Sequence, residues 1–182
     1  DGIRDCLLSR GLGDVYKRQV HTHFCFAFRR LIGMTLDLPQ SVLFCCDHNA
    51  VRSPMAEGFM KKFYGTGTYV QSVGVMNDLE IDGFAIAVCE ELGIELSRHR
   101  SRSFDEMQEW GDDLSSFDLI IALSPASQRR ALDLTRLFHL TVEYWPIMDP
   151  TGLGETREAK LVSYRQTRDQ IVDQLLRRWG KG

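Results

Sequence analysis

Apolar residues fall into two kinds of pattern that alternate along the chain from residue 41 onward. Four short runs, at residues 41–45, 68–74, 117–124 and 141–146, are rich in β-branched, aromatic and aliphatic side chains. The runs at 41–45 and 117–124 are almost continuously apolar, which is typical of strands buried on both faces of a parallel sheet. We therefore expect four β-strands.

A segment with helical features follows each of these strands. After the first strand, Ser53 is expected to be an N-cap, Pro54 the first helical residue and Gly65 the stop. The alternating order implies right-handed crossovers, so the chain is expected to be an α/β protein with three layers, a four-stranded parallel sheet and helices on both faces. The helices expected after the second, third and fourth strands span residues 81–94, 125–138 and about 156–179.

Residues 1–33 do not share this pattern. They show neither sustained helical nor strand periodicity, and their opening resembles a translated adaptor sequence. We expect residues 1–33 to be a non-native or disordered leader, with a natural flexible extension as the alternative. Met34 then offers a natural start, and residues 34–182 are expected to form one domain.

Composition narrows the class of protein. Charged residues make up 26% of the chain and hydrophobic ones 43%, as in ordinary globular proteins, and the net charge of -3 argues against a nucleic-acid partner. No apolar run approaches the roughly 18 residues that a membrane-spanning helix needs, so no membrane partner is expected. The five cysteines have no regular spacing, which favours reduced thiols and a cytoplasmic location.

The sequence CDHNAVRS, residues 46–53, connects the first strand to the first helix. Ligands of parallel sheets bind beyond the carboxyl ends of the strands. A tight arc from Asp47 to Arg52 would turn backbone N–H groups toward a common centre, next to a helix N-terminus. Arg52 adds a planar guanidinium that suits a tetrahedral oxyanion. We therefore predict a phosphate-binding loop after the first strand.

Cys46 begins this loop and is the candidate nucleophile. The positive field of the loop favours the thiolate, which is the reactive form. Ser53 can donate a hydrogen bond to the sulfur, and Asn49 tolerates the left-handed backbone that such a loop needs. Cys45 points to the opposite face of the strand and is expected to be structural. The alternative is that both cysteines are core residues and Arg52 is a solvated surface residue.

Asp149, in the sequence MDPTG, follows the fourth strand and is expected at the same sheet edge as Cys46. Transfer of a phosphoryl group needs a proton donor for the leaving oxygen. A carboxyl group close to a bound dianion and a thiolate favours its protonated form, so Asp149 can act as a general acid. Pro150 would stiffen the loop; an ordinary Asp-Pro turn is the alternative.

Five segments carry a resemblance to a known family. VLFCCDHNAVRSPMAEG, SVG, ELGIELSRHRSRS, DLIIALS and DPTG, in this order, resemble the low-molecular-weight protein tyrosine phosphatase family. Its superfamily includes the thioredoxin-coupled arsenate reductases. The match covers roughly residues 41–178. The resemblance implies a four-stranded parallel sheet with flanking helices and a reaction that uses no metal or other cofactor.

The resemblance also implies roles for particular residues. Cys46 would be the nucleophile that forms a phosphocysteine, Arg52 the phosphate clamp, and Asp149 the general acid and later the activator of the hydrolytic water. Ser53 would tune the thiolate. The backbone amides of the loop would complete the substrate-binding site, which gives Asp47, His48, Asn49, Ala50, Val51 and Ser53 as substrate-binding residues.

Two supporting residues are implied as well. Asn49 would hold the loop through contacts with Ser72 and His99. His48 lies within the loop and either senses the phosphate charge or points to solvent while its amide binds.

Two departures from the family pattern affect the expected activity. Members active on phosphotyrosine usually carry aromatic residues directly after the Asp-Pro pair, where this chain has Thr151 and Gly152. Arsenate reductases of this type need two cysteines after the third strand, where this chain has none, and Cys89 lies on the preceding helix.

We therefore expect a cysteine-dependent phosphomonoester hydrolase, similar to protein tyrosine phosphatases, that acts on a phosphorylated protein or a small aryl phosphate. One alternative is an arsenate reductase that uses an external thiol such as glutathione or glutaredoxin. The other is a non-catalytic domain that binds oxyanions.

Overall fold

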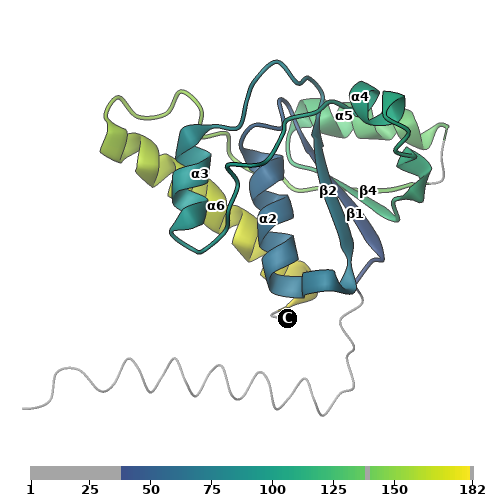
Figure 1. The fold of residues 1–182 in the computed structure, drawn as a ribbon, viewed down its shortest axis with the longest axis horizontal. Helices are drawn as coiled ribbons and strands as arrows, with labels where there is room; N and C mark the ends of the chain where they lie inside the picture. Colours follow the sequence, from purple (N-terminus) through teal and green to yellow (C-terminus); the bar gives the residue numbers. More distant parts are fainter. Residues whose placement is uncertain (1–37, 138–139, 181–182) are drawn as a thin grey trace, which may run out of the picture. The chain divides into compact units, whose positions relative to one another are not determined.

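A computed structural model of the protein describes residues 38–137 and 140–180 (Figure 1). The leader expected at residues 1–33 lies outside them and stays a prediction. Within the described residues, strands and helices alternate along the chain as the sequence pattern predicts. The elements are β1 (Ser41–Cys46), α2 (Arg52–Tyr64), β2 (Tyr69–Gly74), α3 (Gly83–Glu90), α4 (Phe104–Glu109), β3 (Leu119–Ala122), α5 (Pro125–Thr135), β4 (Thr141–Tyr144) and α6 (Arg157–Trp179).

The four strands form one parallel sheet in the order β2-β1-β3-β4. Strand β1 therefore has a neighbour on each side, and all six of its residues are buried. Cys46 pairs with Gly74 at the end of β2, and Cys45 pairs with Ala122 at the end of β3. The register thus brings the segments that follow β1, β2 and β3 to the same edge of the sheet.

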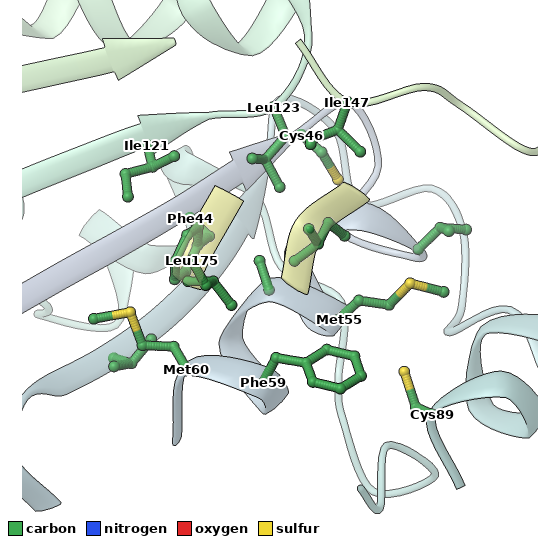
Figure 2. Packing of buried hydrophobic residues seen from close by; sticks show 14 of the residues in the cluster. Phe44, Cys46, Met55, Phe59, Met60, Cys89, Ile121, Leu123, Ile147 and Leu175 are labelled. Carbon is green, nitrogen blue, oxygen red and sulfur yellow. The ribbon is translucent and has the colours of Figure 1, made fainter. Parts of the chain in front are cut away.

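Side chains alternate along β1 between two apolar layers, because successive residues of a strand point to opposite faces. Val42, Phe44 and Cys46 pack in the cluster formed with α2, α3 and α6. Figure 2 shows Phe44 in this cluster together with Phe59 of α2 and Leu175 of α6.

The opposite face of the sheet carries a second apolar cluster, to which α4 and α5 contribute (Figure 1). Leu43 and Cys45 belong to it, with Met107 of α4 and Leu134 of α5. The expected three-layer arrangement, with a parallel sheet between two layers of helices, is therefore confirmed.

The start of the first helix differs from the prediction. Helix α2 begins at Arg52 rather than at Pro54, and Ser53 is not its N-cap. The hydroxyl group of Ser53 instead lies beside the sulfur of Cys46, so it is not available as a cap. Gly65 ends the helix with a positive φ of 59°, as expected of a C-terminal glycine.

Capping side chains explain two further differences. Asp82 accepts hydrogen bonds from the backbone N–H groups of Phe84 and Ala85, so α3 begins at Gly83 rather than at residue 81; it ends at Glu90, before the predicted 94. The short helix α4 was not predicted; it begins with a capping box formed by Ser103 and Glu106. Helix α5 begins at Pro125, as predicted.

Helix α6 is 23 residues long and begins after the capping side chain of Thr156, close to the predicted start. Its inner positions Tyr164, Ile171 and Leu175 are buried, while charged residues lie between them. Neither α6 nor any other helix within residues 38–137 and 140–180 combines the length and the apolar composition needed to cross a membrane.

Candidate active site

Cys46 is the last residue of β1, and its side chain lies beside a hydroxyl group of the following helix. The Cys46 Sγ–Ser53 Oγ distance is 3.0 Å, and the residue is only 2% exposed. The Ser53 hydroxyl also accepts a hydrogen bond from Asn49 Nδ2 at 2.9 Å. Ser53 is therefore held by Asn49 of the loop, and its one hydroxyl proton can be donated to the sulfur or to the Val73 carbonyl oxygen 3.2 Å away.

Asn49 adopts the left-handed backbone conformation expected of it, with φ of 53°. Its side chain is fully buried, and its Nδ2 group also donates to Ser72 Oγ at 2.9 Å. Its Oδ1 atom accepts from the backbone of Arg102 and from His99 Nε2, both at 3.1 Å. These bonds fix the middle of the loop to β2 and to the segment before α4.

Glu57 continues this network beneath the loop, and the sequence analysis did not identify it. Its Oε2 atom accepts a hydrogen bond from Ser72 Oγ at 2.5 Å and lies 3.9 Å from His99 Nδ1. Glu57 stands four residues after Ser53, so helical spacing places both on one face of α2. Glu57 could have been identified from this four-residue spacing in the sequence.

His99 donates from Nε2 to the side-chain Oδ1 atom of Asn49, since an amide oxygen can only accept. Burial is the main cause that lowers the pKa of His99 below its usual value of 6.5, and the nearby Glu57 only partly opposes it. The imidazole therefore favours the neutral form, with its proton directed at the loop.

Arg52, the first residue of α2, is 5% exposed, so the alternative that it is a solvated surface residue is wrong. Its Nη1 group donates to the carbonyl oxygen of Ile147 at 3.3 Å. Its Nη2 group lies 2.5 Å from Asp47 Oδ2 and 2.7 Å from Asp149 Oδ2. One guanidinium thus bridges the loop after β1 and the loop after β4.

Asp149 is held by hydrogen bonds at both carboxylate oxygens. Oδ1 accepts from the backbone N–H of Thr151 at 3.0 Å and from its hydroxyl at 2.6 Å, while Oδ2 faces Arg52. The side chain is 40% exposed, in contrast to the buried guanidinium. Asp149 therefore lies at the same edge of the sheet as Cys46, where a proton can be exchanged with solvent or with a ligand.

The residue before Asp149 is fixed by helix α6. Gln170 accepts a hydrogen bond from the backbone N–H of Met148 at 3.1 Å, and the Thr167 hydroxyl donates to the Met148 carbonyl at 3.1 Å. Both backbone polar groups of one residue are thus bonded to two side chains one turn apart. These partners could not be predicted from sequence patterns, because they depend on how α6 packs.

The rest of the loop is bound mainly through its backbone. Ala50 and Val51 are buried, and the Ala50 carbonyl accepts from the N–H of Asp82 at 3.0 Å. His48 is partly exposed, and its Nδ1 atom lies 2.6 Å from Asp78 Oδ1, a bond that lowers the pKa of Asp78. The His48 side chain therefore points toward the segment after β2.

Asp82 also connects the loop to two helices. Its Oδ1 atom caps α3, and its Oδ2 atom accepts a hydrogen bond from the Tyr164 hydroxyl of α6 at 3.0 Å. Burial, followed by the charge of Asp82, raises the pKa of Tyr164, so the phenol remains a donor.

Gly74, at the end of β2, allows the loop to approach closely. A Cβ atom at this position would lie 2.8 Å from the backbone nitrogen of Asn49. The next two residues donate N–H groups to the carbonyl oxygens of Cys46 and Asp47, at 3.0 and 2.8 Å. A side chain here would displace the loop or break this connection.

Ser124, between β3 and α5, is another residue that the sequence analysis missed. Its hydroxyl donates to Asp47 Oδ1 at 2.8 Å and also caps α5. The rule that strand ends share a sheet edge could have identified it, because it follows β3 as Cys46 ends β1.

The other cysteines of the described residues lie away from this loop. Cys45 is fully buried on the opposite face of β1, as expected, and burial raises the pKa of its thiol. Cys89, on α3, is also fully buried, and burial raises its pKa to about 12. Figure 2 shows Cys89 in the same cluster as Cys46 and Met55.

The sequence of this chain is similar to a known protein family. Residues 41–181 match the model of the family described as low molecular weight phosphotyrosine protein phosphatase. The chain belongs to this family. The matched residues include the whole loop from Cys46 to Ser53 and the segment that carries Asp149.

Relatives within this family have more than one named activity. The arsenate reductase of Bacillus subtilis (strain 168) is 30% identical over 138 residues, which cover 74% of this chain and 91% of that protein. The structure of an arsenate reductase in the phosphate binding state is 25% identical, with a TM-score of 0.53, and the match covers 76% of this chain and 98% of that one.

The Erwinia amylovora tyrosine phosphatase AmsI shares the fold, with a TM-score of 0.57 and 19% identity. That match covers 76% of this chain and 92% of the AmsI chain. The family therefore fixes the fold, and it does not decide between the phosphatase of the family description and the arsenate reductase of the 30% identical relative.

Proposed function

We propose that this protein is a cysteine-dependent phosphomonoester hydrolase that acts through a phosphocysteine intermediate. The observation that supports this most strongly is the position of Arg52. This residue lies at the end of the loop that begins at Cys46, and its guanidinium is 2.7 Å from the Asp149 carboxylate. A clamp for an oxyanion and a proton donor are therefore adjacent. Both are needed for phosphoryl transfer to a thiolate.

In the proposed first step, the Cys46 thiolate attacks phosphorus and the bond to the leaving oxygen breaks. Arg52 and the backbone amides of the loop bind the equatorial oxygens. Asp149, protonated in the bound complex, gives its proton to the leaving oxygen. The Ser53 hydroxyl, 3.0 Å from the sulfur, stabilises the thiolate before attack.

In the proposed second step, water attacks the phosphocysteine. Asp149, now a carboxylate, takes a proton from this water, and the S–P bond breaks to release inorganic phosphate and the thiolate. The Ser53 hydroxyl then stabilises the departing sulfur. The network of Asn49, Ser72 and His99 keeps the loop in the same shape through both steps.

The substrate is proposed to be a phosphorylated protein or a small aryl phosphate. Thr151 and Gly152 follow the Asp-Pro pair, and the Thr151 side chain is occupied with Asp149 Oδ1. Neither of these two residues can give an aromatic contact to a substrate ring. A loose fit to the ring, and so a broad range of aryl leaving groups, follows from that arrangement.

An arsenate reductase is the second candidate, and the 30% identical relative of that name favours it. Reduction of arsenate to arsenite consumes two electrons, which two thiols supply as they form a disulfide, while one arsenate oxygen leaves as water. Within residues 38–137 and 140–180, the other two cysteines, Cys45 and Cys89, are both fully buried, so this candidate draws its electrons from an external thiol such as glutathione or glutaredoxin. A non-catalytic oxyanion-binding domain is the third candidate.

A side-by-side assay of the full chain distinguishes the three. One arm measures release of phosphate from an aryl phosphate, and the other measures consumption of glutathione with glutaredoxin in the presence of arsenate. The proposal expects the first activity to exceed the second by far. Arsenate-dependent thiol oxidation without ester hydrolysis would replace it with the second candidate, and binding of phosphate with neither activity would replace it with the third.

A further inference from the structure

The loop that binds the oxyanion carries an acidic side chain of its own. Asp47 directly follows Cys46, and its Oδ2 atom lies 2.5 Å from Arg52 Nη2, the same nitrogen that faces Asp149. The guanidinium of the proposed clamp is therefore paired with two carboxylates. A carboxylate in this place is unexpected, since the loop otherwise presents positive charge to an anion.

Asp47 is also held rigidly from its other side. Its Oδ1 atom accepts a hydrogen bond from Ser124 Oγ at 2.8 Å, and Ser124 is 1% exposed. The Ser124 hydroxyl in turn accepts from the backbone N–H of Ser127 in the first turn of α5. The carboxylate therefore cannot swing away freely when an anion arrives, because α5 and the end of β3 fix its position.

Asp47 and a bound oxyanion consequently compete for one guanidinium. An anion in the loop competes with Asp47 for the Nη2 group of Arg52, and it lies close to a carboxylate that is 26% exposed. Like charges a few ångströms apart in a partly buried site repel strongly. The repulsion grows with the charge of the ligand, so it acts on inorganic phosphate, on arsenate and on the dianion of a phosphate monoester alike.

We propose that Asp47 sets the affinity of the loop for anions, because its carboxylate competes for Arg52 and weakens the binding of tetrahedral dianions. The inference rests on the proposed function, in which inorganic phosphate is the product. Weak phosphate binding speeds release of that product and limits inhibition by phosphate in solution. The same residue lowers affinity for arsenate, which has the same shape and charge.

The test compares phosphate binding by the full chain with and without the carboxylate. Asp47→Asn keeps the size of the side chain and an oxygen that can accept from Ser124, but it removes the charge. We expect its dissociation constant for inorganic phosphate, measured by titration calorimetry, to fall about ten-fold, because the repulsion is removed. Inhibition of aryl phosphate hydrolysis by added phosphate should strengthen by the same factor.

Asp173→Asn is the matched control, since it removes the same charge from an exposed position of α6. Its phosphate affinity should equal that of the original chain. Asp47→Ala is a second variant that removes the carboxylate without the amide, and it should also bind phosphate more tightly. Unchanged or weaker phosphate binding in both Asp47 variants, with folding intact by circular dichroism, overturns the inference.

The outcome can be separated from that of the proposed function. If the chain hydrolyses no aryl phosphate, the proposed function fails, but calorimetry still decides whether Asp47 weakens phosphate binding. If the chain hydrolyses aryl phosphate and Asp47→Asn binds phosphate no more tightly, only the inference about Asp47 fails.

Discussion

The two loops that meet at Arg52 are built in opposite ways. Six of the eight residues 46–53 are buried, and their side chains and carbonyl groups are bonded to β2, α2 and the segment before α4. In the loop that carries Asp149, only two of the eight residues 147–154 are buried, and 151–154 are exposed. One loop is fixed by the core, while the other is fixed at a few points and faces solvent.

This difference separates two tasks. A loop that must hold backbone amides around an oxyanion needs a single rigid shape, because preorganised donors contribute most to stabilising developing charge. A loop that presents a proton to many leaving groups has to meet substrates of different shape. We expect substitutions in the first loop to abolish the reaction and those around the second to change which substrates react.

The largest effect on turnover is expected at Cys46, the first residue of loop 46–53, the rigid loop. Cys46→Ser removes the nucleophile, so turnover of an aryl phosphate should fall by about 10⁴-fold or more. Phosphate should still bind, since Arg52 and the amides remain; phosphate release and calorimetry measure the two quantities. Cys45→Ser, one residue earlier and on the other face of β1, should keep turnover. A Cys46→Ser protein with full turnover would remove the nucleophile assignment.

A smaller and more selective effect is expected from Asp149→Asn. The amide cannot donate an acidic proton, so esters with a poor leaving group, such as phenyl phosphate, should slow by about 10²-fold or more. An ester with a good leaving group, such as 4-nitrophenyl phosphate, needs little protonation and should slow far less. Rates for both esters under saturating conditions test this. Equal slowing of the two would mean that Asp149 only positions Arg52.

The rigid loop should also respond to pH through the residue beneath it. The pKa of His99 is lowered in the folded protein, mainly by burial, so the unfolded chain binds this proton more readily. The contribution of His99 to stability is therefore complete above pH 6.5, its usual pKa, and decreases as the pH falls below that value. Urea unfolding at pH 7.5 and pH 5.5 measures it.

His99→Gln keeps a donor for Asn49 but cannot take up a proton in this range. Its free energy of unfolding should therefore change less between pH 7.5 and pH 5.5 than that of the original chain. An identical change in both proteins would mean that another group causes the dependence on pH.

Sequence patterns were sufficient for the sheet and for the positions of the rigid loop. Buried parallel strands are continuously apolar, so β1 and β3 were predictable, and their carboxyl ends defined where Cys46 had to lie. The left-handed conformation of Asn49 was predictable for the same reason: a tight loop needs a residue that tolerates it.

Other features depend on competition that local patterns do not contain. Ser53 fits an N-cap by residue type, but its hydroxyl bonds to the sulfur of Cys46 and the amide of Asn49, and α2 begins two residues before the predicted start. The pairing of Asp47 with Ser124 joins residues 77 positions apart. Such contacts follow from the packing of the whole sheet, and a single sequence without structure does not specify them.

The smallest effect is expected where α6 fixes the exposed loop. Gln170→Leu removes the acceptor for the Met148 N–H, and Thr167→Val removes the donor to its carbonyl, so each frees one side of the residue next to Asp149. A hydrogen bond contributes about 1 kcal/mol net, so each substitution should lower the rate of hydrolysis about five-fold if the bond holds Asp149 in place. The loss should appear with phenyl phosphate and be small with 4-nitrophenyl phosphate, as for Asp149→Asn. Gln170→Glu keeps an acceptor and should restore the rate. Equal loss with both esters would mean that α6 supports the rigid loop as well, and the contrast between the two loops would then be one of exposure only.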